Sequence, residues 1–505
     1  MSVPTDLHMR PNDVAGAVDT IVLVMLENRS FDHLLGWMSL PPYGNRTDIE
    51  GLKGRIDSTT RELTNPAYRN RARNQVWRPY MAEKDVCLAS DLPHGRNGVR
   101  MQMHYVLHGY LADVQTGEKY DREGFAMDGF ADALFEEHRE LKWGSCPDSM
   151  MMMPPELIPA TAFLAREFMV CDHWFSPIPT DTHPNRFMSL CGYTKIDETG
   201  GIPPDHESVL DWCDGQNLRW RVYHEAFSFV TLFTVRRPHS LELAPEHFRN
   251  VSELAHDFQR ESAATFPHFV IVEPSYADDH YFAWKATDNH PPNPMGPGEG
   301  FLADVYRAVT SNPERWKRTV MIVVYDEHGG FFDHVPPFRV TTSSQGYEDD
   351  AWKDKADFLT SGPRVPAIIV SPLVARGSAS SRRFDHTSIL QLLADVAAPG
   401  NAYSKLVADR HKEGGIHSLS TVLAGQPLQG MAPIMPPVRL PNSANALPRP
   451  AQPKTPGVMA FEKARQMLAG ERKEAVAAIS RNAAQKIKLG SRNYIAARHT
   501  AVSKA

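Results

Sequence analysis

Two short stretches of the chain share a pattern in which a run of apolar residues ends in oxygen-bearing side chains. The first run covers residues 21–26 and the second covers residues 320–325. A carboxylate and a second oxygen donor follow each run directly: Glu27, Asn28, Asp326 and Glu327. Side chains of these types are hard ligands, so together they predict an oxygen-rich cation site. The alternative is that each stretch is an ordinary polar turn after a strand.

The ligand types restrict the metal that such a site would hold. Zinc in proteins is bound mostly by His and Cys, whereas carboxylate and amide oxygens favour Ca²⁺, Mg²⁺, Mn²⁺ or iron. The sequence offers one such ligand set, so we predict one divalent metal ion of these four kinds.

A hydroxyl that could act as a nucleophile comes from Thr182, which opens the sequence Thr-His-Pro-Asn-Arg at residues 182–186. The apolar segment 187–192 that follows is typical of a helix. A hydroxyl at a helix start lies beside free backbone N–H groups, which favour a bound phosphate. The alternative role for Thr182 is the helix N-cap, a common use of threonine.

Buried strands are needed to position these side chains. Short, continuous apolar runs rich in β-branched residues are typical of strands covered on both faces, and open α/β sheets bind ligands at the carboxyl ends of such strands. Further runs at residues 218–224, 267–274 and 364–372 alternate with helix-like segments. The pattern predicts an α/β fold with a mostly parallel central sheet flanked by helices.

The composition of the 505-residue chain excludes several classes of protein. Its net charge of −6 provides no basic field for nucleic acid, and no apolar run approaches a membrane span. The five cysteines are odd in number and form no CxxC pair, so we interpret them as mostly free thiols of a reducing compartment. The first 20 residues lack the pattern of an ordinary secretory signal.

Three motifs, at residues 27–33, 182–186 and 325–337, together resemble those of the bacterial phosphoesterase family. This family includes phosphocholine-preferring phospholipases C and certain acid phosphatases, and its core is alkaline-phosphatase-like. The resemblance extends from about residue 19 to about residue 397. It implies that the protein is bacterial, and we expect it in the cytoplasm or exported by a specialised route that needs no signal peptide.

The resemblance also implies roles for single residues. Thr182 would be the nucleophile and a metal ligand beside Glu27, Asn28, Asp326 and Glu327. Three histidines would hydrogen-bond the phosphate oxygens or protonate the leaving group: His94, His224 and His290. His290 precedes Pro-Pro as in the family, His94 is followed by Gly-Arg where the family has an aromatic residue, and His224 is placed by spacing.

The resemblance implies a metal-dependent phospholipase C that hydrolyses phosphatidylcholine-like lipids through a phospho-threonine intermediate. Two alternatives remain open: a broad acid phosphatase, and a non-catalytic effector or binding module on the same core. Phospholipid is the expected substrate, with peripheral membrane contact, and protein partners are unknown.

We divide the chain into a catalytic domain at residues 1–425, a proline-rich linker at 426–456 and a basic helical tail at 457–505. We expect the tail to fold back on the core and to influence substrate access or membrane contact.

Overall fold

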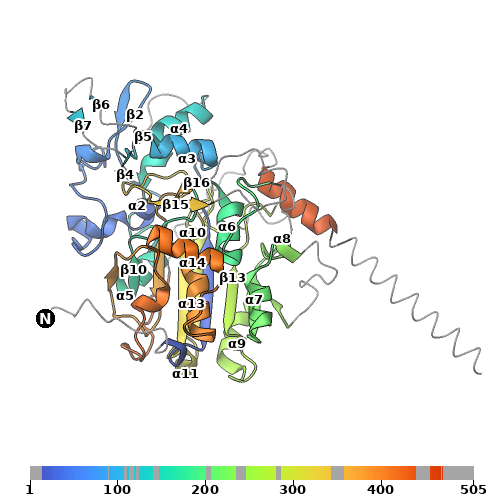
Figure 1. Ribbon diagram of the computed structural model, residues 1–505. Helices are drawn as coiled ribbons and strands as arrows, with labels where there is room; N and C mark the ends of the chain where they lie inside the picture. The colour runs from blue at the N-terminus through green and yellow to red at the C-terminus, as the bar shows by residue number, and fades with distance from the viewer. Residues whose placement is uncertain are drawn as a thin grey trace, which may run out of the picture.

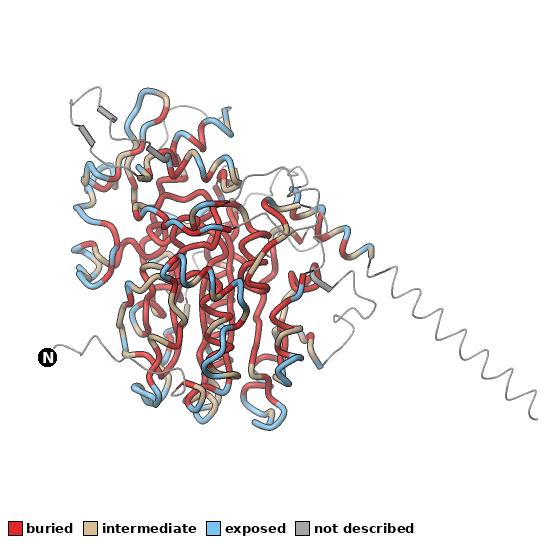
Figure 2. Tube along the Cα trace, in the orientation of Figure 1, coloured by how far each residue is buried: buried red, intermediate tan, exposed pale blue. Residues whose placement is uncertain are grey.

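A computed structural model of the protein describes most of the chain. The described residues are 14–88, 90–106, 111–112, 119–120, 124–139, 147–200, 206–234, 246–279, 286–342, 358–438, 455–467 and 469. Among these residues, one large cluster of buried hydrophobic side chains packs around a central sheet (Figures 1 and 2).

The central sheet has eight strands in the order β12-β11-β13-β1-β14-β17-β10-β18. Every pairing in it is parallel except those of β17, which runs antiparallel to both β14 and β10. The mostly parallel α/β sheet is therefore confirmed. The strand bounds are β1 Thr20–Leu26, β10 Met169–Cys171, β11 Trp220–His224, β12 Phe248–Asn250, β13 Phe269–Glu273, β14 Thr319–Tyr325, β17 Ala367–Val370 and β18 Ala379–Ser380.

The pairing of β1 with β14 decides where the site forms. All seven residues of each strand are buried, as expected for strands covered on both faces. Their register runs without a break from Thr20 opposite Thr319 to Leu26 opposite Tyr325. Glu27 and Asp326 therefore leave neighbouring strands at the same level.

Helices pack on the sheet in two groups. Helix α10 contacts α5 and α9, while α13 contacts α6, and Figure 1 shows α13 and α14 in front of the strands. The helix bounds are α2 Phe31–Leu34, α3 Arg96–Met103, α4 Phe130–Glu137, α5 Pro159–Glu167, α6 Thr182–Cys191, α7 Val209–Gly215, α8 Thr231–Thr234, α9 Leu254–Arg260, α10 Gly296–Val309, α11 Pro313–Trp316, α13 Thr387–Ala397 and α14 Lys405–Gly414.

Five small two-stranded sheets lie outside the central one. They pair β2 (Asn70–Ala72) with β3 (Gln75–Trp77), β4 (Tyr80–Met81) with β9 (Met151–Met152), β5 (Tyr105–Val106) with β8 (Gly124–Phe125), β6 (Leu111–Ala112) with β7 (Lys119–Tyr120), and β15 (Arg339–Thr342) with β16 (Phe358–Thr360).

The predicted linker and tail are described only in part, so the proposed domain division stays a prediction. Described parts of both contact the core. The Tyr306 hydroxyl donates a hydrogen bond to the Pro433 carbonyl at 2.6 Å, and residues 456–467 form a helix with Phe461 buried. Most of the tail, from residue 470 onward, lies outside the described residues.

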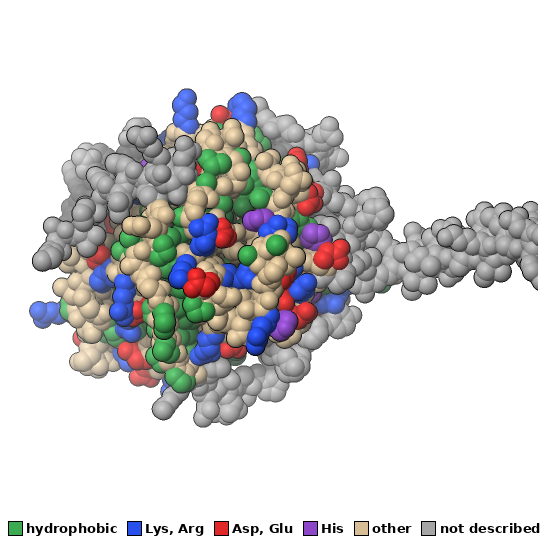
Figure 3. Space-filling view, turned by 90° about the horizontal axis from the view of Figure 1, so that it is seen from below, with side chains coloured by type: hydrophobic (Ala, Val, Ile, Leu, Met, Phe, Trp, Pro, Cys, Tyr) green, Lys and Arg blue, Asp and Glu red, His purple; other side chains and the backbone are tan. Residues whose placement is uncertain are grey.

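The surface carries both charge signs. Figure 3 shows the molecule from below, where Lys and Arg side chains alternate with Asp and Glu rather than gathering into one basic area. Among the described residues, no helix combines the length and the apolar character that crossing a membrane requires.

One buried arginine joins the loops that follow β1 and β14. Arg364 is fully buried, and it donates to Asp333 at 2.8 Å and to Asp32 at 3.1 Å. It also donates to the backbone carbonyls of Glu50 and Asp172. The carboxylates of Asp32 and Asp333 are buried too, so water cannot solvate their negative charge. The arginine offsets that charge.

We predict that Arg364→Ala lowers the free energy of unfolding by about 3–5 kcal/mol, because it leaves the buried Asp333 without its cation and Asp32 with His334 alone. Urea unfolding at pH 7 measures the change. Arg376→Ala is the control, since Arg376 pairs with Glu167 at the surface and the change there should stay under about 1 kcal/mol. Equal stability losses in the two variants would contradict the assigned role of Arg364.

Candidate active site

The four predicted oxygen ligands lie where the register of β1 and β14 requires. The backbone N–H groups of Asn28 and Glu327 both donate to Asp326 Oδ1, at 2.9 and 2.7 Å. Glu27, Asn28, Asp326 and Glu327 are each at most 3% exposed as whole residues. Two strand ends almost 300 residues apart in sequence therefore form one buried cluster.

The glycines after the second run allow the two loops to approach each other. Asn28 and Gly329 both have positive φ angles, of 60° and 63°. A Cβ atom on Gly329 would lie 2.0 Å from the Asn28 carbonyl oxygen, which is a severe overlap with backbone. Only glycine fits at this position without a shift of the loop that carries Asn28.

Thr182 joins this cluster from the start of α6. Its side chain is buried, and its Oγ1 donates to Asn28 Oδ1 at 3.3 Å. The N-cap of α6 is Asp181, so Thr182 is the first residue of the helix proper. The hydroxyl therefore points to the ligand cluster and does not cap the helix.

Two of the predicted histidines flank Asn28. His94 Nε2 lies 3.4 Å and His290 Nε2 lies 3.1 Å from Asn28 Nδ2. Each ring is fixed through its other nitrogen, because Nδ1 donates to a backbone carbonyl, that of Leu92 or that of Pro291. Both rings therefore present Nε2 to the cluster.

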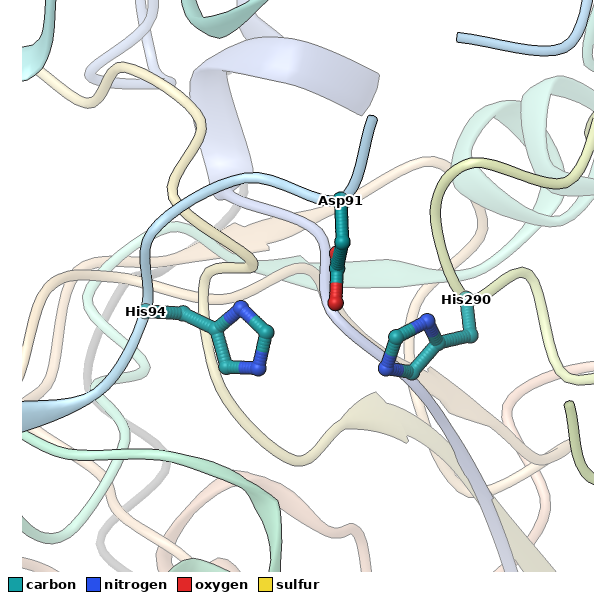
Figure 4. Close-up of side chains that lie close together, drawn as sticks. All are labelled: Asp91, His94 and His290. Atoms are coloured by element: carbon teal, nitrogen blue, oxygen red, sulfur yellow. The ribbon is translucent and has the colours of Figure 1, made fainter. Parts of the chain in front are cut away.

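Asp91 is an addition that the sequence analysis missed. It lies between His94 and His290 (Figure 4), and one ligand atom from each of the three lies within 4.8 Å of the others. The negative charges of Glu327 and Asp91 overcome burial and raise the pKa of His94 to about 9. Asp91 likewise helps to raise the pKa of His290 to about 9, against the effect of burial.

His224 also lies at the carboxyl end of a sheet strand, but further from Asn28 than His94 and His290 do. It ends β11, which is separated from β1 by β13. Its Nδ1 donates to the Ala226 carbonyl at 2.5 Å. Among the described residues, no hydrogen bond or ion pair joins it to the other predicted site residues, so its role stays a prediction.

Arg186 is the second addition, although it lies in a motif that the sequence had singled out. Its side chain is 3% exposed and lies 3.1 Å from Glu27 Oε1 and 3.3 Å from Asp326 Oδ2. Arg186 is four residues after Thr182, about one helical turn, so both side chains lie on the same side of α6. It supplies a fixed positive charge inside the carboxylate cluster.

Burial and charge act on the carboxylates in different ways. Burial raises the pKa of Glu27 well above its ordinary value and that of Asp326 to about 6, while Arg186 opposes both rises. For Glu327, burial acts in the same direction, but the positive charges of His94 and His328 lower its pKa below the ordinary value.

The residues present fit a divalent cation. Glu27 Oε2 and Glu327 Oε1 are buried and have no hydrogen-bond partner among the described residues. Buried carboxylate oxygens normally have a partner, so two of them without one in the same cluster indicate a missing positive ligand. A second acidic group, Asp32 with Asp333 and His334, differs because Arg364 already neutralises it.

Comparison with known families and sequences gives consistent results. A model of the phosphoesterase family matches residues 18–397. The chain is 28% identical over 399 residues to "Non-specific phospholipase C1" of Arabidopsis thaliana, a match that covers 75% of this chain and 67% of that protein. It is 27% identical over 409 residues to "Phospholipase C B" of Mycobacterium tuberculosis, covering 74% and 72%.

The fraction of each relative's length that this chain matches differs from one relative to the next. The chain is 26% identical to "Non-hemolytic phospholipase C" of Burkholderia pseudomallei, where the match covers 74% of this chain but 54% of that protein. Among solved structures, a protein in the alkaline phosphatase superfamily from Vibrio parahaemolyticus matches with a TM-score of 0.30 and 11% identity, covering 50% of this chain and 62% of that one.

We predict that Gly329→Ala lowers the free energy of unfolding by about 1–3 kcal/mol and weakens metal binding, because the loop carrying Asn28 must move. Thermal unfolding and calorimetric titration with Mn²⁺ measure the two effects. Gly377→Ala is the control, because Gly377 has a similar φ of 59° but its nearest neighbour is the Arg166 carbonyl. Unchanged metal affinity in Gly329→Ala would contradict the assigned role of this contact.

Proposed function

Because the chain belongs to the phosphoesterase family, we propose that this phosphoric ester hydrolase is a metal-dependent phospholipase C acting on phosphatidylcholine-like lipids. The observation that carries the proposal is the hydrogen bond from Thr182 Oγ1 to Asn28 Oδ1, inside a cluster of buried, partly unpaired carboxylates. The relatives named as phospholipases C support the choice of substrate class.

In the proposed mechanism Thr182 Oγ1 attacks phosphorus and forms a phospho-threonine, which water then hydrolyses. Glu27, Asn28, Asp326 and Glu327 would hold the cation together with Thr182. A divalent cation bound there would favour the deprotonated hydroxyl and offset charge on the phosphate. Which of Ca²⁺, Mg²⁺, Mn²⁺ or iron occupies the site is open to direct measurement.

The histidines stabilise the charge that develops on the phosphate. His94 and His290 lie on either side of Asn28, so each can donate from Nε2 to a non-bridging oxygen or protonate the departing diacylglycerol oxygen. Glu327 and Asp91 raise the pKa of His94, and Asp91 helps to raise that of His290, so both rings gain proton affinity against the effect of burial. We assign His224 to a more distant part of the same substrate.

The substrate proposal has two competitors, an acid phosphatase and a non-catalytic module. Mass-spectrometric product analysis on a panel of phospholipids and simple phosphate monoesters, with and without chelator, separates the three. Diacylglycerol with phosphocholine is the expected product, lost on chelation. Faster turnover of monoesters would show that the protein is a phosphatase. If no ester is turned over in a metal-dependent way, the protein is a non-catalytic binding module.

We predict that Thr182→Ala folds and binds metal but loses turnover by a factor on the order of 10⁴–10⁶, because it lacks the nucleophilic oxygen. Thr182→Ser, which keeps a hydroxyl, is the matched control and should retain measurable turnover. Steady-state assays with a soluble phosphocholine ester provide the comparison. Turnover of Thr182→Ala near that of the unmodified protein would remove Thr182 from the mechanism.

We predict that Glu27→Ala and Asp326→Ala each abolish both metal content and activity, because a site with few ligands depends on every carboxylate. Elemental analysis of the purified proteins measures the metal directly. Asp257→Asn serves as the control, because Asp257 is a buried carboxylate that pairs with Arg249 away from the cluster. Full metal occupancy in both alanine variants would overturn the shared cation site.

A further inference from the structure

The helix at residues 456–467 lies outside the stretch matched by the family model, yet it packs on the core beside the site. Figure 1 draws it in red close to α6 and α8. Ala460, Phe461 and Ala464 are at most 2% exposed and form its inner face. Met459 and Lys463 are exposed on the same two turns.

Polar contacts fix both ends of this helix to the loop after β13. Thr455 Oγ1 donates to Asp278 Oδ1 at 2.9 Å, and Arg465 donates to Asp279 Oδ2 at 2.6 Å. At Gly457, an added Cβ would lie 1.8 Å from Asp278 Oδ2, so the helix start contacts this loop directly. The helix is therefore seated in a defined position.

Phe461 contacts three aromatic rings of the core. Its centroid lies 5.3 Å from that of Phe227, 5.8 Å from that of Tyr276 and 6.5 Å from that of Phe229. The planes are inclined by 50–67°, within the arrangements that aromatic pairs favour.

Two of these rings, those of Tyr276 and Phe229, also pack against the Arg186 guanidinium. Its guanidinium carbon lies 4.9 Å from the Tyr276 ring centroid and 5.1 Å from that of Phe229. Arg186 Nη1 donates to the Tyr276 hydroxyl at 3.0 Å. Phe461 is therefore one aromatic layer away from the cation that pairs with Glu27 and Asp326.

We propose that Phe461 is a positioning residue for the reaction, which acts through Tyr276 and Phe229 to keep Arg186 at a fixed distance from the carboxylate cluster. The inference rests on the proposed cation site. Arg186 must offset part of the negative charge without pairing so closely with Glu27 and Asp326 that it displaces the metal ion. Aromatic rings on its outer side limit its movement, and Phe461 closes the far side of those rings.

The C-terminal helix therefore completes the active site from outside the family core. Groups that orient metal ligands through an intermediate side chain commonly change metal affinity about 10–100-fold when they are removed. Phe461 does not touch the substrate in this arrangement, so its removal should lower kcat and metal affinity while KM stays nearly constant.

The test uses full-length protein carrying Phe461→Ala, with Mn²⁺ affinity measured by calorimetric titration and kcat and KM measured on a soluble phosphocholine ester. We expect the Kd for Mn²⁺ to rise about tenfold and kcat to fall, with partial rescue in Phe461→Leu. Met459→Ala is the matched control, an apolar truncation on the exposed side of the same helix.

A second control separates positioning from general loss of stability. Leu254→Ala removes a buried side chain from α9, which lies at the lower end of the molecule in Figure 1. It should lower the melting temperature without changing Mn²⁺ affinity. If Phe461→Ala does not fold, Phe461→Leu and Arg465→Ala provide the same comparison.

The outcomes distinguish this inference from the proposed function. If the unmodified protein binds no Mn²⁺ or other divalent ion, the cation site itself is wrong and the inference fails with it. If the unmodified protein binds the ion and the folded Phe461 variants have the same Kd and kcat, the cation site stands and the positioning role is overturned. A change that Leu254→Ala reproduces in full also overturns it.

Discussion

The unbroken register between β1 and β14 is the constraint on which the rest of the structure depends. It places Glu27 and Asp326 at the same level, at the buried carboxyl ends of two central strands, where water cannot solvate their charges. Every further feature of the site compensates for that burial. Backbone N–H groups donate to Asp326 Oδ1, Arg186 supplies positive charge, and one oxygen each of Glu27 and Glu327 has no hydrogen-bond partner among the described residues.

The strands and the meeting of the four oxygen-bearing side chains could be predicted because each depends on a local pattern. A buried parallel strand appears in the sequence as a continuous apolar run, and the polar residues that end it lie at the binding edge. The runs before Glu27 and Asp326 therefore indicated both the sheet and the site. The reversed direction of β17 could not be predicted, because a short buried strand has the same composition in either orientation.

Asp91 and Arg186 show what sequence patterns cannot supply. Asp91 reaches the site through a loop whose path depends on tertiary packing, and only Leu92 and Pro93 separate it from His94. Arg186 stood in a motif, but its role depends on Tyr276, which is 90 residues away. Likewise, the composition of the tail predicted a helix but gave no indication that Phe461 would be buried.

The strand order also has a consequence for synthesis of the chain. β1 is made first, yet its two neighbours in the sheet, β13 and β14, begin at Phe269 and Thr319. At about 5–20 residues per second, a ribosome needs roughly 12–60 s to supply them after β1 emerges. Until β13 emerges, this strand, apolar in every residue after Thr20, has neither of its partners, so the nascent chain can shield it only by transient contacts with the segments made in between.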